Sequence, residues 1–121
     1  MSTALVIEDS LNELSIIKDF CKELGITVVV AGSGEEAINK LHQCQPNVII
    51  LDVVLPGRSG FEICRELKGA GQTRTIPVIL CSTKSSDMDK FWGLRQGADA
   101  YITKPIDQEV FNTTIKQFLK S

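Results

Sequence analysis

Apolar runs and amphipathic stretches alternate five times along the chain. The apolar runs are short and rich in valine and isoleucine, which is typical of strands buried on both faces of a parallel sheet. The most hydrophobic run starts at Val48, delivers one carboxylate, Asp52, at its end, and is followed by a Pro-Gly turn. The predicted strands cover residues 4–8, 26–31, 48–52, 76–81 and 98–103.

Apolar residues at helical spacing follow each strand. Ser10 with Glu13, and Ser33 with Glu36, have the spacing of a capping box, in which serine and glutamate cap the helix start reciprocally. The fourth helix is expected over about 86–96, with one of its two aromatic residues in the core and the other partly exposed. The last helix is expected to start near 107 and to bury Val110, Phe111, Ile115, Phe118 and Leu119.

Strands that alternate with helices over short connections indicate an α/β fold with helices on both faces of a five-stranded parallel sheet. The 121 residues fit one domain, and they contain no linker, low-complexity segment or second domain. We therefore expect a single domain over 1–121 without an output domain. Ligands of open parallel sheets bind outside the carboxyl ends of the strands, so functional residues are expected there.

The formal net charge of −2 gives no reason to expect nucleic-acid binding. No apolar stretch is long enough to span a membrane, and the first residues lack the basic region of a signal peptide. We expect a cytoplasmic protein with no membrane partner.

The cysteine and histidine positions do not indicate a metal or disulfide site. The four cysteines are spread along the chain without a C-x-x-C pair, which favours core packing of free thiols over disulfides or metal binding. His42, the only histidine, is expected on the surface. Gly32-x-Gly34 lacks the third glycine of a dinucleotide fingerprint and is interpreted as a turn.

Polar residues stand where the predicted strands end. They are Glu8 and Asp9, Asp52, Ser82 and Thr83, and Lys104. Singly, each has an ordinary structural interpretation as a turn, capping or solvated residue. Together they would place three mutually repelling carboxylates, a hydroxyl and an ammonium at one edge of the sheet, a set that suits Mg²⁺ and a phosphoryl group. An aspartate is then the plausible nucleophile, and it would form an acyl phosphate.

These residues resemble the receiver domain of two-component response regulators, in its stand-alone, chemotaxis-regulator-like form. The resemblance rests on Glu8-Asp9, on Asp52 followed by Pro56-Gly57, on Ser82 and on Lys104-Pro105, and it covers essentially the whole chain. It implies the flavodoxin-like, doubly wound strand order 2-1-3-4-5. It also implies that Asp52 accepts a phosphoryl group from a histidine kinase, a phosphotransfer protein or a small phosphodonor.

The same resemblance implies a role for each matching residue. Asp9, Asp52 and the Val54 carbonyl would bind Mg²⁺, and Glu8 would act on it through water. Lys104 would contact the phosphoryl oxygens, and its bond to Pro105 is expected to be cis. Ser82 keeps the hydroxyl of the commoner threonine.

Phosphorylation would then draw the Ser82 hydroxyl inward and let Tyr101 rotate inward, which changes the surface formed by helix 86–96, strand 98–103 and the last helix. A protein target would contact that surface. Apolar Val54 cannot orient a water, so slow self-dephosphorylation is expected; Lys84 matches the second rate-tuning position. Such a protein is not a conventional enzyme, although it catalyses its own phosphoryl transfer and dephosphorylation.

Two other classes of protein are considered. An aspartyl phosphatase would carry a second aspartate two residues after the nucleophile, where this chain has Val54. A receiver-like interaction module that is not regulated by phosphate usually loses the acceptor, the acid pair or the lysine, and this chain retains all of them.

Overall fold

The computed structural model describes residues 2–119 as layers of helices around one five-stranded sheet. All neighbouring strands run parallel, in the order β2-β1-β3-β4-β5. The strands are β1 (Thr3–Ile7), β2 (Thr27–Ala31), β3 (Val48–Asp52), β4 (Val78–Ser82) and β5 (Ala100–Thr103). The helices are α1 (Leu11–Glu23), α2 (Gly34–Leu41), α3 (Gly60–Gly69), α4 (Asp87–Arg95) and α5 (Gln108–Phe118). The predicted fold and strand order are confirmed over this part of the chain.

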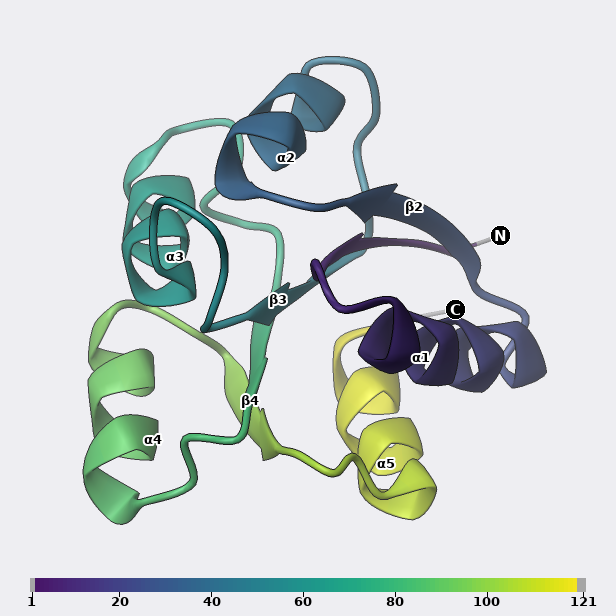
Figure 1. Cartoon of the computed structure of the whole chain (residues 1–121). Helices are drawn as coiled ribbons and strands as arrows, with labels where there is room; N and C mark the ends of the chain where they lie inside the picture. The colour runs from purple at the N-terminus through teal and green to yellow at the C-terminus, as the bar shows by residue number, and fades with distance from the viewer. Residues whose placement is uncertain (1, 120–121) are drawn as a thin grey trace.

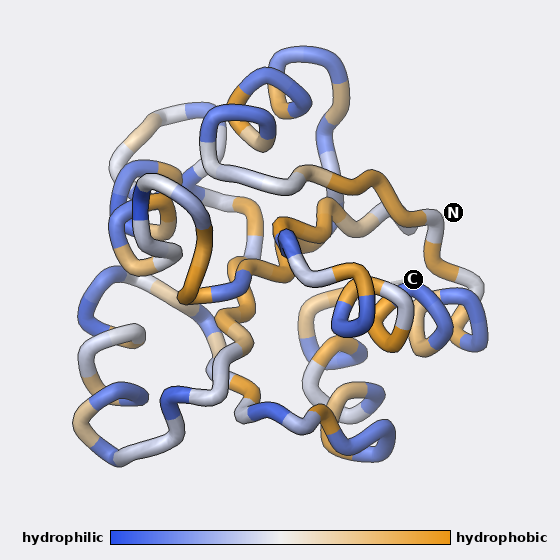
Figure 2. Tube along the Cα trace, in the orientation of Figure 1, coloured by the Kyte–Doolittle hydropathy of each residue, from blue (hydrophilic) through white to orange (hydrophobic). Residues whose placement is uncertain are grey.

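Helices cover both faces of the sheet: α1 and α5 lie on one face, and α2, α3 and α4 lie on the other (Figure 1). Successive side chains of a strand pack alternately against the helices on the two faces of the sheet, as β3 illustrates. Ile50 belongs to the apolar cluster that contains Phe111 of α5, whereas Leu51 belongs to the cluster that contains Ile63 of α3. The hydrophobic colour accordingly concentrates on the central strands, while the hydrophilic colour lies mostly on helices and loops (Figure 2).

The strand register brings the carboxyl ends of the strands together at one edge. Ile7 of β1 pairs with Leu51 of β3, so the residues after β1 lie next to the end of β3. Asp52 pairs with Cys81 of β4, and Ser82 pairs with Thr103 of β5. The residues that follow β1, β3, β4 and β5 therefore meet at the same edge, as the parallel arrangement predicts.

The prediction for the two aromatic residues of α4 is wrong. Phe91 and Trp92 are 57% and 53% exposed, so neither lies in the core. The helix instead turns the buried Gly93 toward the sheet. Apolar residues lie all around α4, so their spacing did not indicate which side faces inward.

The last helix agrees with the prediction except at Val110. Phe111 and Ile115 are fully buried, and Phe118 and Leu119 pack partly buried against the same cluster. Val110 is 50% exposed, so its predicted burial is wrong. Asp107 caps the helix by accepting a hydrogen bond from the Val110 N–H at 3.0 Å, and the next residue, Phe111, takes the inner side instead of Val110.

The four cysteines are free thiols: Cys21, Cys64 and Cys81 are buried, and Cys44 is half-buried. Burial raises the pKa of Cys21 and Cys64 to about 11 and that of Cys81 to about 12, so these thiols are unreactive. Their predicted core packing is confirmed, and His42 is exposed as expected. Between residues 2 and 119, the helices are too short or too polar to cross a membrane.

Candidate functional site

Asp52 is the last residue of β3, and its side chain is only 8% exposed. The backbone around it is tightly constrained. The Gly60 N–H at the start of α3 donates to the Val53 carbonyl at 2.7 Å. A Cβ atom on Gly60 would lie 2.0 Å from the Asp52 carbonyl oxygen, so only glycine permits this close approach. The first residue of α3 therefore helps to hold the Asp52 carboxylate at the sheet edge.

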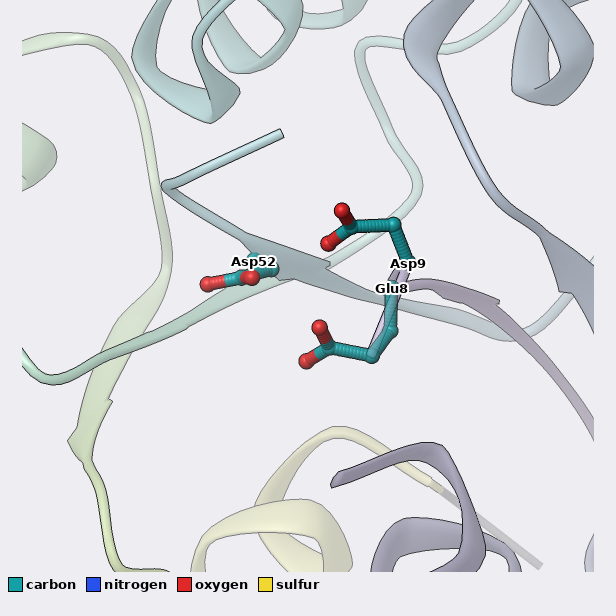
Figure 3. Close-up of side chains that lie close together, drawn as sticks. All are labelled: Glu8, Asp9 and Asp52. Atoms are coloured by element: carbon teal, nitrogen blue, oxygen red, sulfur yellow. The ribbon is translucent and has the colours of Figure 1, made fainter. Parts of the chain in front are cut away.

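The acid pair Glu8-Asp9 follows β1 and meets Asp52 at this edge. Figure 3 shows the three side chains converging from the ends of two adjacent strands. One carboxylate oxygen of each residue lies within 4.8 Å of the other two. Glu8 and Asp52 are buried, whereas Asp9 is exposed. The predicted clustering of these acids is thus present in the structure.

Lys104 brings one positive charge to the three acids. Its Nζ donates to Glu8 Oε1 at 2.7 Å and lies 3.5 Å from Asp52 Oδ1, with the lysine side chain only 6% exposed. The Lys104 N–H donates to the Ser82 carbonyl at 2.9 Å, which continues the β4–β5 pairing to this point. The bond to Pro105 is cis, as the resemblance implies.

Burial and neighbouring charges shift the protonation equilibria of the site. Burial raises the pKa of Asp52 to about 6; the Lys104 charge opposes this shift, and the Glu8 charge adds to it. Burial alone would lower the pKa of Lys104, but its hydrogen bond to Glu8 and the charge of Asp52 outweigh that effect and raise it. Lys104 therefore stays charged, while Asp52 is held in a state that extra positive charge would stabilise.

Ser82 and Tyr101, the two predicted switch residues, are linked through the backbone of Lys84. The Ser82 side chain is fully buried, and its Oγ accepts from the Lys84 N–H at 3.1 Å. The Tyr101 hydroxyl donates to the Lys84 carbonyl at 2.6 Å. The Lys84 backbone, in the loop after β4, thus forms hydrogen bonds to both side chains.

An open pocket of about 460 Å³ lies over the acids, and Thr83 and Glu13 are among the residues that line it. Thr83, rather than the buried Ser82, lines it from the end of β4. Glu13 lines it from α1. Its spacing predicted a capping box, but the Ser10 N–H that it would cap donates to Glu8 Oε2 at 3.2 Å instead. The spacing alone did not reveal that Glu8 takes this donor.

The donor set of this pocket fits a hard divalent cation. Carboxylate oxygens are the ligands that Mg²⁺ prefers, and the open side leaves room for the waters that it retains. Asp9 and Asp52 point their carboxylates into the shared space, and Glu8 stands beside them. Val54, whose side chain is 58% exposed, also lines the pocket; the use of its carbonyl as a ligand stays a prediction.

A parallel α/β sheet with three acids and a lysine at its carboxyl edge defines a class of phosphoryl-transfer and signalling domains, and comparison with known proteins identifies the family. Residues 4–116 match the response regulator receiver domain. Protein PilH of Pseudomonas aeruginosa is 37% identical over 119 residues, which are 98% of each chain. The chain belongs to the response regulator receiver domain family of two-component signalling, and its fold is CheY-like.

Solved structures agree with this assignment. The chemotaxis response regulator CheY4 of Vibrio cholerae has a TM-score of 0.90 at 28% identity, over 98% of this chain and 99% of that chain. The receiver domain of the sensor histidine kinase PA1611 of P. aeruginosa, crystallised with a magnesium ion in its active-site cleft, has a TM-score of 0.88 over 97% of this chain and 96% of that chain. At 21% identity, this second likeness concerns the fold alone.

Proposed function

We propose that this chain is a phosphorylation-dependent switch whose acceptor is Asp52. The observation that carries the proposal is the position of the Asp52 carboxylate, which lies beside two further acids and 3.5 Å from the Lys104 ammonium. In the transfer, an Asp52 oxygen forms a bond to phosphorus while the P–N bond of a phosphohistidine breaks, and the leaving imidazole keeps that electron pair. The donor is a histidine kinase, a phosphotransfer protein or a small acyl phosphate.

The residues around Asp52 supply positioning and charge neutralisation, which dominate catalysis of phosphoryl transfer. Asp9, Asp52 and the Val54 carbonyl would hold Mg²⁺, with Glu8 acting through water. When bound, Mg²⁺ supplies positive charge that stabilises both the acids and the transferring oxygens. The Lys104 ammonium lies 3.5 Å from Asp52 and would donate hydrogen bonds to the oxygens of a phosphoryl group bound there. Glu8 orients Lys104 for this task through the 2.7 Å ion pair.

The protein would also catalyse loss of its own phosphoryl group, in which a water oxygen bonds to phosphorus and the Asp52 carboxylate leaves. That water needs a polar group beside the acyl phosphate. Val54 is exposed at the pocket and offers an apolar side chain there, which supports slow self-dephosphorylation.

The proposed output is contact of the α4-β5-α5 surface with a protein target. Ser82 and Tyr101 would couple this surface to Asp52 through the Lys84 backbone. Four apolar residues of α4, which include Phe91 and Trp92, are more than half exposed, and this apolar exposure supports the choice of surface. The free thiols support a reducing compartment, and we place the protein in the cytoplasm.

Intact-mass measurement after incubation with acetyl phosphate and Mg²⁺ tests the proposal. The wild-type mass should increase by one phosphoryl group, and Asp52→Asn should abolish the increase. Asp19→Asn, which removes an exposed carboxylate from α1 outside the pocket, is the matched control and should be phosphorylated like the wild type.

Two outcomes would point to other functions. If the wild type gained no phosphoryl group with Mg²⁺ from either acetyl phosphate or a panel of phosphorylated kinases, the chain would act as an interaction module that phosphate does not regulate. If it hydrolysed external phosphoesters over many turnovers, a phosphatase would be the better assignment.

A further inference from the structure

Helix α4 contains a glycine, Gly93, at a buried position two residues before its end. A glycine inside a helix disfavours folding relative to alanine by roughly a fivefold factor in the equilibrium constant. The backbone does not require glycine here, because positive φ angles within residues 2–119 occur at Gly25, Gly57 and Gly97 and not at Gly93. The reason for this glycine must therefore lie in the space beside it.

That space is filled by Tyr101 of β5 and by Leu80 of β4. A Cβ atom on Gly93 would lie 2.9 Å from Cδ2 and 3.1 Å from Cε2 of the Tyr101 ring, and 2.8 Å from Cδ1 of Leu80. Contacts this short force a neighbour to move. The Leu80 atom is a terminal methyl group, whereas the two Tyr101 atoms belong to the edge of a flat ring that moves only as a unit.

The far end of the Tyr101 side chain is also held. Its hydroxyl donates to the Lys84 carbonyl at 2.6 Å, in the loop between β4 and α4. The ring therefore spans the distance from the Gly93 backbone to the β4–α4 loop. Any side chain at position 93 would push against a ring whose far end is held by this hydrogen bond.

We propose that Gly93 is a positioning residue that admits the Tyr101 ring beneath α4 and so sets which position the switch tyrosine can take. A methyl group at 93 drives the ring outward, or lifts α4, and releases the Lys84 carbonyl. Lys84 also binds Ser82 through its N–H, so this displacement reaches the Ser82 end of the coupling. The consequence for signalling rests on the proposed function, whereas the effect on the ring does not.

Gly93→Ala tests the proposal, with Gly69→Ala as the matched control. Gly69 is the last residue of α3, and a Cβ atom there meets nothing within 4 Å. The chain has one tyrosine and one tryptophan, so the signals of Tyr101 and of the neighbouring Trp92 are unambiguous. Burial raises the pKa of Tyr101 above its ordinary value, which gives a second signal in an absorbance titration.

Gly93→Ala should shift the aromatic resonances of Tyr101 and lower its pKa toward that of free tyrosine, and Gly69→Ala should change neither. Unchanged resonances and an unchanged pKa in Gly93→Ala would overturn the proposal. If Gly93→Ala fails to fold, adding Tyr101→Val should restore folding because it removes the ring. Failure of this double variant to fold, while Tyr101→Val alone folds, would also overturn the proposal.

Phosphorylation separates this inference from the proposed function. Asp52 in Gly93→Ala should gain a phosphoryl group from acetyl phosphate and Mg²⁺ as the wild type does, while the phosphorylation-induced change in the Tyr101 signal is lost. Absence of phosphorylation in both proteins, with Tyr101 displaced in the variant, would refute the switch function and leave the role of Gly93 intact.

Discussion

Replacing Asp52 with asparagine should stabilise the protein at neutral pH when no divalent cation is present. The folded state raises the pKa of this carboxyl from 3.8 to about 6, because it is buried and lies beside Glu8. A shift of about two units means that ionised Asp52 costs the folded state about 3 kcal/mol. Asparagine removes a charge whose attraction to the Lys104 ammonium, 3.5 Å away, and to the Val54 N–H, 3.4 Å away, already lowers this pKa. The cost of about 3 kcal/mol is therefore the net cost, and the expected gain in the free energy of unfolding is about 3 kcal/mol.

The pH dependence gives a second, independent signature. A carboxyl whose pKa is raised on folding binds its proton more tightly in the folded state, so its contribution to stability is fully present below about pH 4. That contribution is lost as the pH rises through about 6. The free energy of unfolding of the wild type should therefore decrease over this window relative to that of Asp52→Asn, which lacks the titrating group.

Urea unfolding followed by circular dichroism, at several pH values and with a chelator present, measures both effects. Asp19→Asn controls for the general loss of one negative charge. Mg²⁺ at a thousand times its dissociation constant should then reverse the order of stability, because it adds about 4.1 kcal/mol to the protein that binds it. A less stable Asp52→Asn protein in chelator at neutral pH, with an unchanged denaturant slope, would refute the electrostatic reasoning.

Three further substitutions test other parts of the site. Val54→Asn should shorten the lifetime of phosphorylated Asp52 by on the order of tenfold, because an amide can orient the attacking water; an unchanged half-life by intact mass would contradict this. Ser82→Ala should leave phosphorylation largely intact but weaken signalling and abolish the response of the tyrosine resonances, and a surviving response would show that coupling bypasses the hydroxyl. Glu13→Gln should weaken Mg²⁺ binding roughly threefold by calorimetric titration, since a charge at a solvated pocket rim contributes under about 1 kcal/mol, whereas Asp19→Asn should not weaken it.

The fold could be predicted to a large extent from the sequence, because hydrophobic periodicity and β-α alternation are local signals. The burial of Val48–Asp52 on both faces follows from its unbroken apolar run. The strand order does not follow from periodicity, since pairing of β1 with both β2 and β3 depends on which way each connection crosses the sheet. That order came from the resemblance to receiver domains.

The candidate site was predictable for a related reason. Parallel strands direct their carboxyl ends to one edge, so the residues after four strands had to meet there. What escaped prediction depends on contacts between distant elements. Glu13 has the spacing of a capping residue, and only the position of Glu8 shows that it lines the pocket instead. Nothing in the sequence singles out Gly93, because its close approach to the Tyr101 ring brings α4 against β5.

The negative charge of Asp52 is only partly compensated in the unphosphorylated site, and this imbalance would favour the binding of a cation. Glu8 and Lys104 are each paired at 2.7 Å, so the charge that is left poorly compensated is that of Asp52, whose distance to the ammonium is 3.5 Å. The same burial that makes ionised Asp52 unfavourable makes any added cation beside it more effective, because electrostatic interactions strengthen where water is excluded. In the proposed switch, phosphorylation would give Lys104 a stronger acceptor than Glu8, and Lys104 directly follows β5, the strand that carries Tyr101. The poorly compensated charge of unphosphorylated Asp52 and the attraction of a phosphoryl group on Asp52 would thus both act on the Lys104 side chain.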